Sequence, residues 1–262
     1  MSKILTIAHT IWLEMIRKKD VFVLLILLGA ILVILISLDV FGLGTVVRYI
    51  TDMGMMMAWI FSWILAINVS ARELPQEESR GTIFPLLAKP LTRIELITGK
   101  WLGSLSIICT ATLLFYALVI GVVLLKDGTL YPLVLLQGYI LHCVCLSLVT
   151  AITIAFSIRM NYDAAASLSY VLTATAFLLV PRIPEFMTRE TGFGAYALMF
   201  LYNLLPHFEV FDLRHRIVHG FTPLDWRIFG MVLAYGLLMT AAFLLIAWLS
   251  YRNKRFIRGN LI

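Results

Sequence analysis

Six long apolar runs, separated by segments that hold most of the charged residues, dominate the chain. Each run is about as long as the roughly 20 residues that an α-helix needs to cross a bilayer core about 30 Å thick. The pattern therefore predicts an all-α integral membrane protein with six transmembrane helices in a single domain, residues 1–262. The runs are Val21–Leu38, Met53–Val69, Trp101–Leu125, Leu133–Ile158, Ala164–Val180 and Ile228–Leu249.

The composition excludes a soluble domain. Hydrophobic residues make up 61% and charged residues 14% of the chain, and the mean hydropathy is +0.95, whereas soluble domains average about 25% charged residues. The net charge of +6 does not indicate nucleic acid binding, because the basic residues flank the apolar runs. Anionic lipid headgroups are their expected partner. The cysteines Cys109, Cys143 and Cys145 lie inside apolar runs and lack the spacing of a disulfide or zinc site.

Lysine and arginine positions predict the orientation in the membrane. Six spans place both termini on one side, where the connecting segments carry fourteen basic residues, against seven on the opposite side. The side richer in Lys and Arg is normally cytoplasmic. We therefore expect both termini in the cytoplasm, and the long loop of residues 182–227 on the external side.

Residues 1–20 are expected to form an amphipathic helix that lies on the cytoplasmic leaflet. We expect Trp12 at the interface and the basic side chains of Arg17, Lys18 and Lys19 at the headgroups. The alternative is that this segment simply continues the first span. The apolar residues that recur at helical spacing are Ile4, Ile7, Ala8, Ile11, Trp12 and Met15.

Strongly polar residues inside the spans are few. A membrane enzyme needs several acids, bases or metal ligands that converge at one depth, and a proton-coupled carrier needs buried carboxylates. The spans hold Asn68, Gln137 and His142, with Asp163 at the mouth of the fifth span. This set offers no catalytic residue, and we interpret His142 as a hydrogen-bonded core residue.

Two weaker patterns suggest metal ligands. His215 and His219 are four residues apart, which places both imidazoles on one face of a helix, and His207 is a possible third ligand. No cysteine or second pair supports this site, so we expect an interfacial helix there and no metal. A methionine cluster is compatible with Cu(I) binding, but more often provides adaptable apolar packing. It consists of Met53, Met55, Met56 and Met57.

The most informative segment is the predicted cytoplasmic loop of residues 71–100. The acidic residues Glu73, Glu77 and Glu78 precede Gly81, where the chain can turn, and Thr82 can then N-cap a short helix.

This short helix is followed directly by a second one. Pro85 falls within its first turn, where the missing N–H is tolerated, and Lys89-Pro90 ends it. Thr92 then begins the second helix with Glu95 three residues on, which is the capping-box spacing. The cluster of large apolar residues on the short helix favours a docking surface over a solvated connector. Its members are Ile83, Phe84, Leu86 and Leu87.

At this loop the sequence resembles the permease subunits of ABC transporters, specifically the type-2 exporter class. The family's pattern runs from acidic residues through Gly-Thr, Leu-Leu-Ala, Pro and Arg to Gly-Lys. Pro85 departs from it, because family members more often have an ordinary helix former there. With Glu73, the candidate ATPase-coupling residues are Glu77, Glu78, Gly81, Thr82, Leu86, Leu87, Ala88, Pro90, Arg93, Gly99 and Lys100.

The resemblance implies that the short cytoplasmic helix couples to a separate ATPase subunit, which the N-terminal helix braces against the membrane. It further implies a second permease, expected to be a copy of this chain, and two ATPase subunits that bind ATP and Mg²⁺. Short re-entrant helices are expected in the external loop, residues 182–227. The expected location is a bacterial-type cytoplasmic (inner) membrane.

We expect this chain itself to be neither an enzyme nor a cofactor-binding protein. A P-loop needs a glycine five residues before its Gly-Lys and a Ser or Thr after it, whereas Gly99-Lys100 is preceded by Ile94 at that position and followed by Trp101. The apolar walls of the spans favour a hydrophobic or amphipathic cargo. A lipid-modifying enzyme, an ATP-independent carrier and a non-transporting membrane scaffold are the alternative functions.

Overall fold

The computed structural model describes residues 3–37, 46–79, 92–126, 128–129, 131–188 and 192–252, in which all regular elements are helices. Six of them are long and apolar enough to cross a membrane, namely α2, α3, α6, α7, α8 and α12. The all-α fold with six spans is thus confirmed. The elements are α1 (Lys3–Lys18), α2 (Asp20–Ser37), α3 (Val46–Arg72), α4 (Pro75–Ser79), α6 (Arg93–Leu125), α7 (Pro132–Ser157), α8 (Tyr162–Leu179), η2 (Val180–Arg182), α9 (Ile183–Met187), α10 (Phe193–Leu204), η3 (Phe208–Phe211), α11 (Arg214–His219) and α12 (Trp226–Arg252).

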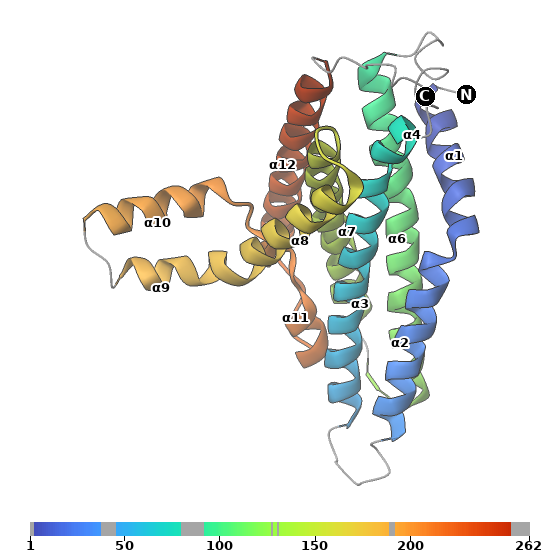
Figure 1. Ribbon diagram of the computed structural model, residues 1–262. Helices are drawn as coiled ribbons and strands as arrows, with labels where there is room; N and C mark the ends of the chain where they lie inside the picture. The colour runs from blue at the N-terminus through green and yellow to red at the C-terminus, as the bar shows by residue number, and fades with distance from the viewer. Residues whose placement is uncertain are drawn as a thin grey trace.

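Helix α7 forms the centre of the bundle. It packs against α3, α6, α8 and α12, and most of its length is buried, whereas α2 and α12 are largely exposed, as expected of helices that face lipid. The start of α1, the end of α12, α4 and the start of α6 lie at one end of the bundle (Figure 1). We call this the terminal end, and the opposite end, where α2 stops and α3 starts, the far end.

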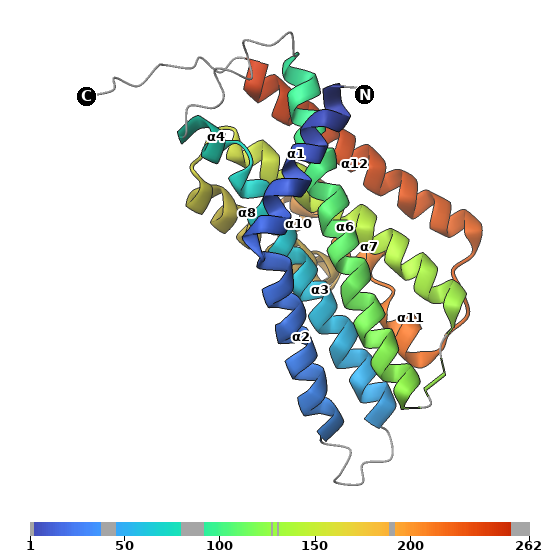
Figure 2. The same ribbon diagram turned by 90° about the vertical axis from the view of Figure 1, so that its right-hand side faces the viewer.

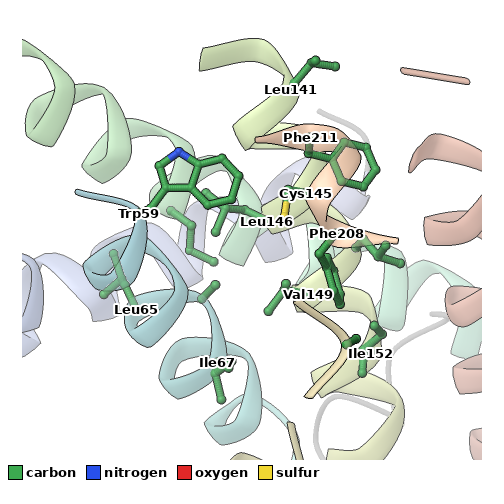
Figure 3. Packing of buried hydrophobic residues seen from close by; sticks show 14 of the residues in the cluster. Trp59, Leu65, Ile67, Leu141, Cys145, Leu146, Val149, Ile152, Phe208 and Phe211 are labelled. Atoms are coloured by element: carbon green, nitrogen blue, oxygen red, sulfur yellow. The ribbon is translucent and has the colours of Figure 1, made fainter. Parts of the chain in front are cut away.

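The core combines the spans with one short segment from the loop before α12. Phe208 and Phe211 of η3 are fully buried and pack beside Cys145 and Val149 of α7, with Trp59 of α3 close by (Figure 3). Part of the predicted external loop therefore inserts between the spans. The loop also contains α9, α10 and α11 as short helices, while their depth in a bilayer stays a prediction.

Helix α1 lies alongside the first half of α6 in both views (Figures 1 and 2). Lys19, with a φ of 56°, separates it from α2, a left-handed conformation that bends the chain between the two helices. The predicted apolar face is confirmed where side chains are described, because Ile7, Ala8, Ile11 and Trp12 are the more buried residues of α1. The side chains of Arg17 and Lys18 lie outside the described set, and the leaflet placement stays a prediction.

Candidate functional site

Only the two roots of the predicted coupling loop belong to the described residues. The first root comprises the end of α3 and α4, with Glu73, Glu77 and Glu78, and the second is the start of α6, with Arg93, Gly99 and Lys100. The remaining predicted coupling residues lie in the range 80–91, outside the described residues. These are Gly81, Thr82, Leu86, Leu87, Ala88 and Pro90.

The second root begins with the predicted capping box. Thr92 is the N-cap of α6: its backbone N–H donates to Glu95 Oε2 at 2.7 Å, and the Glu95 N–H donates to Thr92 Oγ1 at 3.3 Å. The capping prediction is thereby confirmed. Helix α6 then continues without a break to Leu125, so the second root and the third span belong to one continuous helix.

Lys100 connects the two roots. Its ammonium group donates to the Glu73 carbonyl oxygen at 2.9 Å, to Glu73 Oε2 at 3.1 Å and to Glu77 Oε1 at 2.8 Å. The side chains of Lys100 and Glu73 are only 3% and 8% exposed. Because buried charges are stable only when they are paired and hydrogen-bonded, these three residues depend on one another. They hold the end of α3 against the start of α6.

The motif glycine Gly99 lies where α1 contacts α6. A Cβ atom at Gly99 would lie 3.0 Å from Ile7, and one at Gly103 would lie 2.7 Å from Ile11 Cδ1. Trp12 Nε1 also donates to Ser106 Oγ at 2.7 Å. Gly103 was not among the residues predicted from the sequence, although two glycines four residues apart are a known signal for close helix approach in membranes.

Arg93 ties the second root to the end of α12. Its Nη1 atom donates to the carbonyl oxygens of Tyr251 and Arg252, each at 2.6 Å, and its guanidinium lies 5.7 Å from the centre of the Tyr251 ring. A cation at these last carbonyls is also favoured by the helix dipole. This contact was not predicted from the sequence, because Arg93 and Tyr251 are 158 positions apart in the chain.

A cleft of about 420 Å³ opens beside the first root. Arg72 lines this cleft and forms an ion pair with Asp20, with 2.7 Å between Nη2 and Oδ2. The Arg72 guanidinium also lies 5.8 Å from the centre of the Tyr162 ring. The start of α2, the end of α3 and the start of α8 therefore meet at this cleft. Its lining consists of Arg72, Pro75, Gln76, Ser79, Asn161, Tyr162 and Asp163.

The interpretation of His142 needs a correction. The residue is fully buried, as expected, but neither ring nitrogen has a hydrogen-bond partner in the part of the chain that the structure describes. Its ring instead stacks on Trp59, with the ring centres 4.2 Å apart. On the same indole, the Arg214 guanidinium lies 5.1 Å from the ring centre. Tyr116 of α6 also lies beside the imidazole, with ring centres 5.8 Å apart, so ring contacts from α3 and α6 take the place of the expected hydrogen bond.

The metal candidates remain unsupported. His215 and His219 stack on α11 with ring centres 4.1 Å apart, whereas His207 contacts Tyr202 and Tyr235 instead. Among the described residues, no three His, Cys, Asp or Glu side chains are grouped to hold a metal ion. Met53, Met55 and Met57 pack in the apolar core around α2, α3 and α6.

The six long apolar helices define a multi-pass membrane protein. At its terminal end, Lys100 and Arg93 of α6 bind the end of α3 and the end of α12. The chain matches the model of the ABC-2 family transporter protein over residues 5–255, and it therefore belongs to this family. Membership covers nearly the whole chain, which confirms the resemblance found in the loop. No curated protein matches the chain.

Proposed function

We propose that this chain is the membrane-spanning permease subunit of an ATP-driven exporter. It pairs with a second copy of itself and with two separate ATPase subunits, which bind and hydrolyse ATP with Mg²⁺. The chain itself has no enzymatic activity and binds no cofactor. In this proposal the terminal end of the bundle faces the cytoplasm of a bacterial-type inner membrane, with both chain termini on that side.

The observation that carries the proposal is the anchoring of the loop by Lys100. The ammonium group joins Glu73 and Glu77 on one root to α6 on the other, and Arg93 adds the end of α12. A loop rooted in this way moves together with the helices around it. Force from an ATPase on residues 80–91 would therefore displace α1, α3, α6 and α12 as a unit, in the manner of a rigid-body transition.

The cargo is proposed to be hydrophobic or amphipathic. The described residues of α2, α3, α6, α7, α8 and α12 are mainly apolar, and the charged side chains of these helices lie near the helix ends. A small inorganic ion would need converging polar ligands along its path. A lipid-like molecule needs shape and apolar surface instead.

Affinity purification of the tagged full-length chain from its own membranes tests the proposal. We expect an ATPase subunit to co-purify at about one copy per permease. The variants Lys100→Met and Glu78→Lys should reduce its recovery or uncouple its ATP hydrolysis from cargo movement. Arg227→Gln is the matched control, because Arg227 is exposed at the start of α12, far from the loop roots, and it should behave as the unaltered chain.

The opposite result would favour one of the alternatives. If no ATPase subunit associates, the permease proposal fails. Cargo movement by the purified chain alone in vesicles would then indicate an ATP-independent carrier. A stable complex with other membrane proteins and no transport would indicate a scaffold.

A further inference from the structure

The cleft beside the first root has the size and the lining of a ligand site. It is lined by the end of α3, by α4 and by the start of α8, and Figure 2 shows α4 next to α8 at the terminal end. Its volume of about 420 Å³ falls within the range of ligand clefts, roughly 300–1,000 Å³. Two charged side chains and several polar ones face this space, which points to a polar ligand.

The cleft lies at the level where three spans enter the hydrocarbon. Uncharged stretches of 18, 19 and 18 residues separate Asp20, Arg72 and Asp163 from the next charge along α2, α3 and α8, over residues 21–38, 53–71 and 164–181. At 1.5 Å per helical residue, these stretches are about 27 Å to about 29 Å long, close to the thickness of a bilayer core. The three charged residues therefore mark the level of the lipid headgroups.

Arg72 supplies the cationic part of the lining. Its Nε atom donates to the Asn68 carbonyl oxygen at 3.0 Å, and its Nη2 atom donates to Asp20 Oδ2 at 2.7 Å. Its Nη1 atom has no acceptor within the described residues. Asp20 thus holds the guanidinium in position, while the Nη1 edge can donate to the oxygens of a phosphate group, whose geometry suits a guanidinium.

The start of α8 adds an anionic group and a second donor. Asp163 is exposed and makes no ion pair or hydrogen bond with any residue that the structure describes. Asn161 accepts from the Ala164 N–H through Oδ1 at 3.2 Å, which leaves its NH₂ group for a ligand. The cleft therefore offers charges of both signs. A zwitterion satisfies both, whereas a purely anionic headgroup would be repelled by Asp163.

The lining favours a primary ammonium group over a quaternary one. Quaternary ammonium groups are recognised by cages of several aromatic rings. Tyr162 is the one aromatic residue among the described lining residues, and the Arg72 guanidinium already lies over its ring. A primary ammonium instead needs hydrogen-bond acceptors. The Asp163 carboxylate is one, and Ser79 Oγ, which donates to the Gln76 carbonyl oxygen at 3.0 Å, can accept with its lone pairs.

From the cleft toward the far end, the surface of α3 becomes apolar. Asn68, Ile64 and Ile60 precede Arg72 at four-residue intervals, which places all four on one face of the helix. Ile64 is partly exposed, and Ile60 is 42% exposed. On α8, Val171 is 63% exposed. Acyl chains attached to a headgroup in the cleft would meet apolar surface at this depth.

We propose that the cleft binds the phosphoethanolamine headgroup of a phospholipid. Arg72 and Asn161 donate to the phosphate, Asp163 accepts from the ammonium group, and the acyl chains run along α3. The bound lipid connects the first root to α8. The site needs neither an ATPase subunit nor a second copy of the chain, so it stands or falls separately from the proposed function.

Native mass spectrometry of the purified full-length chain in detergent tests the site. The probes are dioleoyl phosphatidylethanolamine, phosphatidylcholine and phosphatidylglycerol, which share their acyl chains and differ only in the headgroup. We expect phosphatidylethanolamine to bind about fivefold more tightly than either of the others, as one additional hydrogen bond predicts. Equal affinities for the three lipids would overturn the proposal.

Two variants locate the headgroup. Asp163→Asn should abolish the preference for phosphatidylethanolamine over phosphatidylcholine. The double variant Arg72→Met with Asp20→Asn should weaken binding of both lipids about tenfold, because both carry the phosphate. Asp52→Asn is the matched control, since Asp52 is an exposed carboxylate at the other end of α3, and it should keep the preference. An unchanged preference in Asp163→Asn would contradict the site.

A soluble fragment distinguishes a lipid from a free phosphodiester. Glycerophosphoethanolamine carries the same headgroup without acyl chains, and we expect it not to displace the lipid at equal concentration. Equal competition by this fragment would overturn the assignment to a lipid. Melting temperatures of the lipid-free variants show whether each one is folded, and Asp163→Asn should melt as the unaltered chain does, because Asp163 makes no contact that the substitution removes.

Discussion

At the scale of single residues, buried charge at Lys100 decides how the loop roots are held together. One ammonium group serves two carboxylates and a backbone carbonyl, with almost no exposure to water. Removing one charged side chain of this cluster costs far more stability than removing all of its charges, because the charge left behind stays buried without compensation.

The burial of the Lys100 charge predicts the behaviour of two variants. Lys100→Met should destabilise the protein by about 3–5 kcal/mol, since it leaves Glu73 and Glu77 uncompensated. Combining it with Glu73→Gln and Glu77→Gln should restore most of the loss. Thermal unfolding of the purified proteins in detergent measures both effects, with Lys126→Met, at the other end of α6, as the control. A triple variant no more stable than Lys100→Met would contradict the charge argument.

At the scale of elements, glycines set how closely neighbouring helices approach. Helix α1 reaches α6 at Gly99 and Gly103. Helix α12 reaches α7 at Gly236, where a Cβ atom would lie 2.3 Å from Val144 Cγ1. Side chains at these positions force the helices apart, and overpacking of this kind costs about 1–3 kcal/mol.

Two pairs of variants test the helix contacts. Gly103→Leu should detach α1 and lower the melting temperature, whereas Gly121→Leu on the same helix should not, because nothing lies within 4 Å of its Cβ position. Accessibility of a cysteine placed by Ile11→Cys, which is buried in the unaltered protein, reports the detachment directly. Unchanged accessibility in Gly103→Leu would show that α1 is not held by this contact.

The second pair concerns α12. Gly236→Ala should be destabilising, whereas Gly230→Ala on the same helix has open space and should be neutral or stabilising by up to about 1 kcal/mol, because alanine is the better helix former. Melting temperatures of the two purified variants are compared. Equal values would mean that α7 and α12 can separate without cost.

At the scale of the whole molecule, the six spans bring the start of α1, the end of α12 and the loop roots to one end (Figure 2). The basic residues concentrate near that end, which predicts a cytoplasmic location. A membrane-impermeant maleimide should therefore label Ser79→Cys only in opened cells, and Arg48→Cys in intact cells, since both positions are exposed. The reverse labelling pattern would invert the orientation and with it the side from which an ATPase could dock.

Features that depend only on residues close together in the sequence could be predicted from local patterns. The six spans follow from the length of the apolar runs, the apolar face of α1 from its 3.6-residue period, and the start of α6 from the Thr92–Glu95 capping box. The resemblance to type-2 ABC permeases also came from a local pattern, the spacing of the loop motif, and the family match over residues 5–255 confirms it.

Only the tertiary structure decided the contacts between distant segments. Lys100 bonds to residues 23 and 27 positions earlier, Arg93 caps a helix 158 positions away, and Phe208 inserts beside Trp63 from a loop that reads as external. The 3.6-residue period of apolar residues predicts which face of a helix is apolar, but it does not predict which neighbouring element covers that face. Packing selects that neighbour, as it does where α1 meets α6 at Gly99 and Gly103.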